Sequence, residues 1–476
     1  MKRRGERGCQ EPRGGQSVSG ATAGSPSSSR GTVGRANRGT PWLWVLAFLL
    51  PAAATVSPAW AIERFPPPDF TAHELPTTTT PSPPWLAWEY LDTAFLATAL
   101  ALAAYLALVR RSRRGLFVLT AISLVWLGFW REGCVCPIGA IQNVTLAIVE
   151  PAYAIPFSVA VIFVLPLVVA LFFGRVFCSA VCPLGAVQEM VAVRPVKVPA
   201  WIDHALGIVP YVYLGGAVLY AATRTTFVVC NYDPFVGFFR RSASASMLLF
   251  GACFLVIGFF VGRPYCRYLC PYGALLGLCS KVSKRHVRIP PEECIKCRLC
   301  EDACPYGAIQ TPTVDQTARE RLSGRRRLAV LLAIFPVLVA AGAWIGHAMA
   351  VPLSRLHPAA ALAERIRLEE AGQLEGTIDA SDAFRNTGRA AKDLYAQALA
   401  LHQRFAIAGG WFGAWVGLVV GVKLIHLSIR RRRTEYQPDK ANCVSCGRCF
   451  WYCPVEQLRL GLIQTLPPVP STSTPS

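Results

Sequence analysis

Charged residues are scarce in this sequence, and their scarcity excludes most water-soluble folds. Asp, Glu, Lys and Arg make up 16% of the 476 residues, hydrophobic residues make up 53%, and the mean hydropathy is +0.38. Soluble domains carry about 25% charged residues. Several apolar runs also reach the ~20 residues that a helix needs to cross a hydrocarbon core. We therefore expect an all-α polytopic membrane protein.

The motifs of nucleotide-driven and hydrolytic enzymes are absent. The sequence has no GxGxxG after a strand, no P-loop, no HExxH and no nucleophile elbow. Its 7 histidines form no pair at matched depth in two clear apolar runs, which argues against haem. We expect neither hydrolytic chemistry nor a bound haem in this chain.

Acidic residues are also few, 28 against 48 basic ones, which gives a formal net charge of +20. No basic stripe is interleaved with aromatic residues, so we expect no nucleic-acid partner. The positive charge gathers instead in short clusters beside apolar runs, as the positive-inside rule describes for cytoplasmic loops. These clusters are Arg110–Arg114, Arg325–Arg327 and Arg430–Arg433.

The first 84 residues have the composition of export and linker segments. Residues 1–40 are rich in Gly, Ser and Arg and should be disordered. The apolar run 42–56 ends near Ala59-Trp60-Ala61, as a cleaved signal peptide does, although an uncleaved first helix is the alternative. We expect 1–61 to be a disordered basic region followed by this signal peptide or helix, and 62–84 to be a periplasmic linker.

Alternation from an outside linker assigns each loop of the remaining chain to one side of the membrane. About seven transmembrane helices are expected, at roughly 85–109, 115–131, 153–173, 206–223, 246–262, 328–350 and 406–429. The cytoplasmic segments are then 174–205, 263–327 and 430–476, each of them basic. The outward segments are 131–152, 224–245 and 351–405.

The same topology predicts the domains. They are a membrane domain 85–280 with duplicated CxxxCP hairpins, a first ferredoxin half 281–327, a helix 328–350, a periplasmic helical loop 351–405, a helix 406–429, a second ferredoxin half 430–465 and a disordered tail 466–476.

Most of the 18 cysteines fall in tight groups that indicate metal ligation. Two groups have the complete CxxCxxCxxxCP spacing of bacterial ferredoxins, in which thiolates hold [4Fe–4S] clusters. Zinc sites do not need the final Cys-Pro, so we prefer iron to zinc. The eight cysteines are Cys294, Cys297, Cys300 and Cys304 in the first run, and Cys443, Cys446, Cys449 and Cys453 in the second.

The two runs are 139 residues apart, from Cys304 to Cys443, and two expected spans lie between them, so both face the same compartment. We predict one small split α+β ferredoxin-like module with two [4Fe–4S] clusters on the cytoplasmic face. In two-cluster ferredoxins the fourth cysteine of each run ligates the other cluster. Cys453 would then complete the first set and Cys304 the second; the alternative is that each run closes on its own cluster.

A second pattern repeats in the membrane domain. Gly-Arg-x-x-Cys-x-x-x-Cys-Pro-x-Gly-Ala occurs at 174–186 and again 88 residues later at 262–274. Its four cysteines, Cys178, Cys182, Cys266 and Cys270, could jointly hold an additional iron–sulfur centre. The alternative is structural, namely tight turns whose cysteines only pack.

The other cysteines give weaker signals. Cys134 and Cys136 form a degenerate third copy of the turn and, with Cys230, are expected on the outer face, where two of the three could form a disulfide or line a redox site. Cys9, Cys253 and Cys279 stand outside any pattern and are expected to be inert.

The paired CxxxCP turns and the two ferredoxin runs together resemble the NosR/NapH-type membrane 4Fe–4S ferredoxin family, over roughly 85–310 and 440–460. In that family NosR is associated with nitrous-oxide respiration and NapH with quinol oxidation that feeds periplasmic nitrate reductase. NosR-like proteins carry a flavin-binding domain before the first helix, and 62–84 is too short for one, so we expect no flavin in this chain.

The resemblance implies a bacterial inner-membrane electron-transfer protein, an electron carrier that could also have quinol dehydrogenase activity. It would link the quinone pool or a cytoplasmic donor to a periplasmic redox protein, with a separate flavoprotein or cytochrome as a candidate partner. The alternative is a membrane redox sensor or a maturation factor for a periplasmic metalloenzyme.

Overall fold

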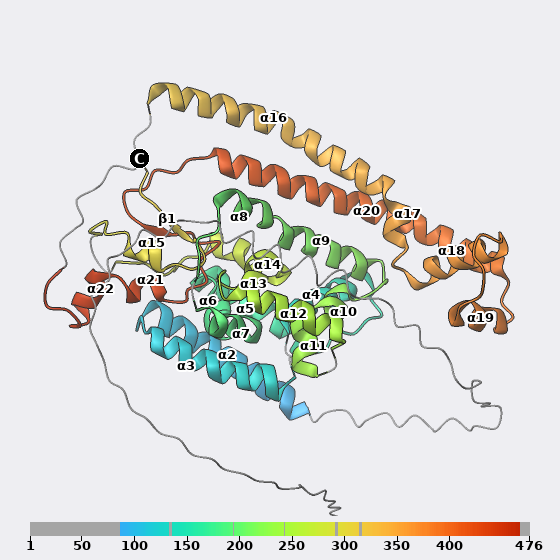
Figure 1. The fold of residues 1–476 in the computed structure, drawn as a ribbon, viewed down its shortest axis with the longest axis horizontal. Helices are drawn as coiled ribbons and strands as arrows, with labels where there is room; N and C mark the ends of the chain where they lie inside the picture. Colours follow the sequence, from blue (N-terminus) through green and yellow to red (C-terminus); the bar gives the residue numbers. More distant parts are fainter. Residues whose placement is uncertain are drawn as a thin grey trace, which may run out of the picture. The chain divides into compact units, whose positions relative to one another are not determined.

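The computed structural model describes residues 86–132, 136–193, 195–241, 243–290, 294–313 and 317–466. The expectations for 1–84, for the tail from 467 onward and for Cys9 and Cys134 lie outside these residues. The described chain is mostly helical, with two short strands (Figure 1).

Five helical segments are long and apolar enough to cross a membrane. They are α2 (Leu86–Leu108), α3 (Arg113–Ser123) continued by the π-helix η1 (Leu124–Trp130), α8 (Ala200–Leu206) continued by α9 (Val209–Ala222), α16 (Ala318–Ala348) and α20 (Ala391–Ser428). Three further apolar helices are shorter: α4 (Pro137–Val149), α5 (Phe157–Phe173) and α12 (Ala245–Gly258).

The expected count of seven spans is not confirmed, because 153–173 and 246–262 correspond to the short helices α5 and α12. Both helices stop before the Gly-Arg of a CxxxCP turn. Gly174 takes a φ of 74° and ends α5, and Arg263 takes a φ of 49° shortly after α12. Left-handed residues break the helical hydrogen-bond ladder, so the turns shorten the helices that carry them.

The two CxxxCP turns form a duplicated unit in which each repeat packs on the other. The first repeat continues from α5 into α6 (Val176–Ala180) and α7 (Pro183–Val191), and the second from α12 into α13 (Pro264–Tyr268) and α14 (Pro271–Lys281). Proline at the first turn of α7 and α14 starts each helix without losing a hydrogen bond. α14 packs against α5, whereas α7 packs against α12.

Helices α16 and α20 pack along most of their length through glycines. A Cβ atom on Gly346 would overlap the carbonyl oxygen of Gly409, and one on Gly413 would overlap that of Gly342. Small residues at such spacing let two helix backbones approach closely in a membrane. The pair therefore depends on backbone contact at its centre.

Between these two helices the expected outer loop 351–405 folds as helices. It contains α17 (Ala350–Ser354), α18 (Pro358–Glu370), α19 (Asp379–Asn386) and the start of α20. A small apolar core of Ala363, Ile366, Leu394 and Ala398 joins α18 to α20. Two short helices, α10 (Val228–Tyr232) and α11 (Pro234–Arg240), lie in the expected outward segment 224–245.

The two ferredoxin runs come together as one small α+β unit (Figure 1). Strand β1 (Ile309–Gln310) pairs antiparallel with β2 (Gln437–Pro438), and the Asp439 amide donates to the Ala308 carbonyl at 2.7 Å. Helix α15 (Leu299–Ala303) packs on α21 (Arg448–Trp451), which α22 (Pro454–Arg459) follows. Segments on either side of the α16–α20 pair thus build one module.

Candidate iron–sulfur sites

The two ferredoxin loops adopt the same backbone conformation. Lys296 and Arg298 in the first run have φ values of 57° and 65°, and Ser445 and Gly447 at the matching positions of the second have 56° and 78°. Left-handed residues at both places turn the chain tightly enough to aim three cysteines at one point. Of these four residues only Gly447 adopts the left-handed conformation without strain. Binding of a cluster by the cysteines would offset the strain at the other three.

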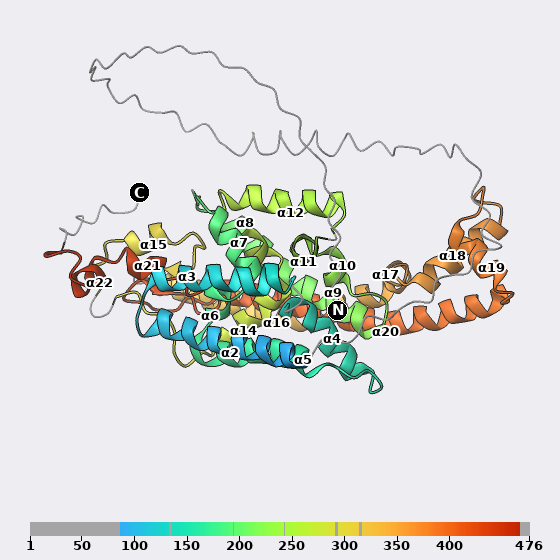
Figure 2. The same cartoon turned by 90° about the horizontal axis from the view of Figure 1, so that it is seen from below.

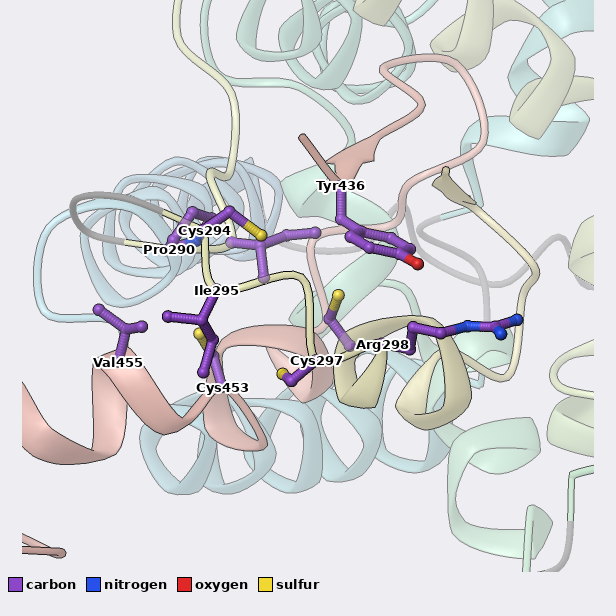
Figure 3. A pocket seen from close by; sticks show the side chains of 10 residues that line it. Pro290, Cys294, Ile295, Cys297, Arg298, Tyr436, Cys453 and Val455 are labelled. Atoms are coloured by element: carbon purple, nitrogen blue, oxygen red, sulfur yellow. The ribbon is translucent and has the colours of Figure 1, made fainter. Parts of the chain in front are cut away.

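The first set of thiols surrounds a cavity at the surface of the module. Cys294, Cys297, Cys300 and Cys453 line a space of ≈ 300 Å³, part of it open to solvent, together with Tyr436 and other residues. Cys294 and Cys297 face this space from the loop before α15, and Cys453 faces it from the residue before α22 (Figure 3). Cys300 lies on α15. We call this set the distal site. Its fourth cysteine comes from the second run, as the sequence predicts.

The second set lies beside the membrane repeat, since Arg175 donates to the Ala441 carbonyl, two residues before Cys443. Burial raises the pKa of Cys449 well above its usual value, and the negative charges of Cys443, Cys446 and Cys304 raise it further. Two cysteines of each set are buried and the other two are partly exposed. We call Cys304, Cys443, Cys446 and Cys449 the proximal site. The structure thus groups the eight cysteines by exchanged fourth members rather than run by run.

The four cysteines of the membrane repeat also meet. Cys178, Cys182, Cys266 and Cys270 line one cavity of ≈ 320 Å³, with Arg175, Tyr272 and other residues around them. This four-cysteine site draws two cysteines from each repeat, as the predicted additional centre requires. Its size matches that of the distal site.

Arg175 tests whether these cysteines fit an anionic cluster. It lines the cavity and is 8% exposed, and its Nε atom is buried without a hydrogen-bond partner. Its guanidinium donates to the Ala441 carbonyl at 2.9 Å and lies 3.9 Å from Cys178 Sγ, and within the described ranges no carboxylate pairs with it. An unpaired buried cation is costly. A cubane held by four thiolates carries net negative charge and would compensate it.

A single metal ion fits less well. Within the described part of the chain no three His, Cys, Asp or Glu side chains close around one point as a lone ion requires. The four irons of a cubane sit at separate corners, so its thiolates are held farther apart than the ligands of one ion. The three cysteine sets suit clusters rather than zinc.

A buried ion cluster, which sequence reasoning missed, joins the membrane repeat to the ferredoxin module. Glu189 on α7 accepts hydrogen bonds from Tyr306 Oη at 2.6 Å, from Arg448 Nη2 at 2.8 Å and from Arg263 Nε at 3.2 Å, and Arg113 lies 3.4 Å away. One sequence feature could have pointed to Glu189. The residue 88 positions later, at the equivalent place in the second repeat, is Gly277, so the repeat is not conserved there.

The ionisation of Glu189 should make this junction sensitive to acid. Burial raises the pKa of Glu189, but Arg263, Arg448 and the Tyr306 hydroxyl together lower it to about 2. A depressed pKa stabilises the fold above the unfolded value near 4.5, and this stability is lost as the pH falls toward 2. We expect about 2–3 kcal/mol of such stability to be missing in Glu189→Gln at pH 7.

The measurement is urea unfolding of the detergent-solubilised protein at pH 7, 5 and 4. The difference in free energy of unfolding between the wild type and Glu189→Gln should narrow as the pH falls, because Glu189 becomes protonated in the unfolded chain near pH 4.5. Loss of clusters in acid affects both proteins alike and cancels from this difference. A constant gap at all three pH values would contradict the assignment.

The remaining cysteines in the described part of the chain are free thiols. Cys136 and Cys230 lie in contacting elements, at the start of α4 and in α10, and no disulfide joins them. In both ribbon views α10 lies on the side of α6 away from α15 and α21 (Figures 1 and 2). Cys253 and Cys279 are also free.

Comparisons with known proteins agree with this chemistry. A family model described as "4Fe-4S binding domain" matches 155–208 and 244–290, the segments that carry the four-cysteine site. A second model with the same description matches 287–310, the first ferredoxin run. No solved structure matches the chain.

Curated relatives match parts of the chain. It is 28% identical to the putative electron transport protein YccM of Escherichia coli, over 38% of this chain and 57% of that protein. It is 33% identical to the protein NirI of Paracoccus denitrificans, over 42% of this chain and 31% of NirI, and 25% identical to the regulatory protein NosR of Stutzerimonas stutzeri, over 42% and 30%. The chain therefore matches less than two thirds of the length of each.

The chain thus carries 4Fe–4S binding domains on a scaffold of apolar helices. It is similar to NirI, NosR and YccM over about two fifths of its length, in agreement with its resemblance to the NosR/NapH-type membrane 4Fe–4S proteins.

Proposed function

We propose that this protein is a membrane-bound electron carrier that links the quinone pool or a cytoplasmic donor to a periplasmic redox acceptor. The observation that carries the proposal is the succession of three cysteine sets, from the distal site through the proximal site, which lies beside the membrane repeat, to the four-cysteine site among the membrane helices. Such a series suits one-electron transfer into a membrane. Quinone is the natural acceptor or donor there, and a separate flavoprotein or cytochrome is the candidate partner on the periplasmic side.

Each set would hold one [4Fe–4S] cluster, and each cluster would supply one-electron redox chemistry at a potential set by its surroundings. The protein's part is to hold the thiolates, limit water and place charges. Cys294, Cys297, Cys300 and Cys453 would ligate the distal cluster. Cys304, Cys443, Cys446 and Cys449 would ligate the proximal cluster, and Cys178, Cys182, Cys266 and Cys270 the third.

The proposed orientation puts the ferredoxin module and the C-terminus in the cytoplasm of a bacterial inner membrane. It is supported by the basic residues that flank the module, at Arg325–Arg327 near the start of α16 and at Arg430–Arg433 after α20. Seven crossings would require the short helices α5 and α12 to span with the turns that follow them. Cys136 and Cys230 would then lie toward the periplasmic side.

Reduction by quinol tests this function. Anaerobic membrane vesicles that contain the chain should show bleaching of the iron–sulfur absorbance on addition of a quinol analogue, at ~1 s⁻¹ or faster, as expected of an enzyme in turnover. Vesicles carrying Cys182→Ser, which removes one ligand of the third site, are the control and should react far more slowly.

A second candidate function is redox sensing, because the relative NosR is described as a regulatory protein. A sensor needs only slow equilibration. Bleaching over many minutes, equal in the wild type and the control, would favour the sensor and contradict a carrier in turnover.

A further inference from the structure

Two arginines occupy equivalent places in the membrane repeats and flank the four-cysteine site. Arg175 and Arg263 each follow the glycine that opens a CxxxCP turn. A Cβ on Gly273 would lie 3.2 Å from Arg175 Nη2, and a Cβ on Gly185 would lie 3.0 Å from Arg263 Nη1. Each guanidinium thus lies against the Cys-Pro-x-Gly turn of the other repeat, where an added Cβ atom would press on it.

Both arginines also reach the loop that carries the proximal site. Arg175 donates to the carbonyl of Ala441, two residues before Cys443. Arg263 reaches Arg448 through Glu189, and Arg448 lies between two proximal cysteines in the sequence. The four-cysteine site and the proximal site therefore share one layer of charged side chains.

Positive charge exceeds negative charge in this layer. Glu189 is the carboxylate that pairs with Arg113, Arg263 and Arg448, and Arg175 adds a fourth guanidinium. The side chains of Glu189 and Arg263 are 7% and 2% exposed, so water screens these charges little. We call Arg113, Arg175, Glu189, Arg263 and Arg448 the charged seam.

The distal site has a more balanced charge environment. Beside Cys453 the buried Glu456 pairs with Arg111, which is 12% exposed, and with Arg459. Arg298 and Lys197, whose side chains are 63% and 59% exposed, pair with Glu301, and Lys197 also pairs with Asp302. Exposed pairs of this kind are weak because solvent screens them. Nearby positive charge favours the reduced form of an iron–sulfur site and raises its reduction potential, so the seam should act on its two neighbours and not on the distal site.

We propose that the charged seam raises the reduction potentials of the proximal and four-cysteine sites above that of the distal site, so that electrons accepted at the distal site run inward. Arg175, Arg263 and Glu189 are positioning residues in this scheme. The inference rests on the proposed function, since it requires that all three sites bind clusters, and it adds the direction of flow.

Each inward transfer moves one electron and oxidises one site as it reduces the next, with no bond made or broken. The distal site is then the docking point for a soluble one-electron donor protein. The final electron acceptor is the periplasmic partner of the proposed function.

The test is a redox titration of the full-length purified protein, followed by electron paramagnetic resonance. In the wild type the distal signal, identified by its loss in Cys297→Ser, should have the lowest midpoint potential of the three. Arg175→Gln should lower the midpoint potential of the four-cysteine signal and leave that of the distal signal unchanged. Arg175→Lys, which keeps the charge, should have a midpoint potential close to that of the wild type. Arg448→Gln, at a less buried position, should lower the midpoint potential of the proximal signal.

Arg267→Gln is the control, because Arg267 lies between Cys266 and Cys270 in the CxxxCP turn of the second repeat but pairs with Asp203 on α8 at 2.7 Å. It should move the potentials much less than Arg175→Gln. The inference is overturned if the distal site has the highest potential, or if Arg175→Gln moves all three signals equally or none. The iron content distinguishes failure of the proposed function from failure of this inference. An iron count too low for a third cluster would contradict the third site of the proposed function. A full iron count with unchanged potentials would contradict only the effect of the charged seam.

Discussion

Replacing Cys178 and Cys266 together by serine is expected to lower the iron content from about twelve to about eight atoms per chain, since each four-thiolate site holds four irons. The two cysteines come from different repeats but line one cavity. Removing both leaves two thiolates, which do not hold a cubane. Iron and sulfide analysis of anaerobically purified protein measures the loss, and electron paramagnetic resonance should show two remaining signals.

Cys253 and Cys279 supply the matched control for this experiment. Both are free cysteines of the same membrane repeat, on α12 and α14, and neither lines the cavity. The pair Cys253→Ser and Cys279→Ser should keep the full iron content. A wild-type count near eight that does not change in Cys178→Ser with Cys266→Ser would mean that the CxxxCP cysteines only pack.

The ferredoxin loops were the part of the site most open to prediction from sequence. Their geometry is local: the spacing of Cys294, Cys297 and Cys300 fixes which thiols face one point, and the matching φ values of Lys296 and Ser445 follow from that spacing. The exchange of Cys304 and Cys453 was also predictable, because the two runs must face the same compartment. The structure groups the cysteines in that way; their binding of iron stays a prediction.

Helix length was harder to predict because hydropathy does not register a left-handed residue. The runs 153–173 and 246–262 are apolar enough to suggest full spans. However, Gly174 takes a positive φ value and ends α5, and Arg263 takes a positive φ value shortly after the end of α12. The repeated Gly-Arg was visible in the sequence, but its conformational role was not.

The charged seam could not be predicted from one sequence. Glu189 pairs with Arg263, Arg448 and Arg113, which lie between 74 and 259 residues away along the chain. No local period or motif encodes such contacts, because they depend on how the repeats and the ferredoxin halves pack. Only the exchange of Glu189 for Gly277 between repeats marked the place where their symmetry breaks.

Gly413→Leu is expected to separate α16 from α20 and to destabilise the protein by about 3 kcal/mol or more, at the upper end of overpacking costs. A Cβ on Gly413 would overlap backbone atoms of Gly342, so the helices rather than a flexible side chain must move. Membrane helices associate through close packing and have little hydrophobic drive to compensate for its loss. Unfolding in mixed micelles with rising denaturant measures the change.

The separation should also reach the ferredoxin module. α16 starts shortly after β1 and α20 ends shortly before β2, so the helix pair sets the spacing of the two halves. Because Cys304 and Cys453 each lie with the other run's cysteines, we expect iron to be lost from the distal and proximal sites while the four-cysteine site keeps its iron. Gly324→Leu is the control, since it lies on the same helix α16 and no atom lies within 4 Å of the added Cβ. Equal stability and iron content in the two leucine variants would mean that the glycine contacts do not hold the halves together.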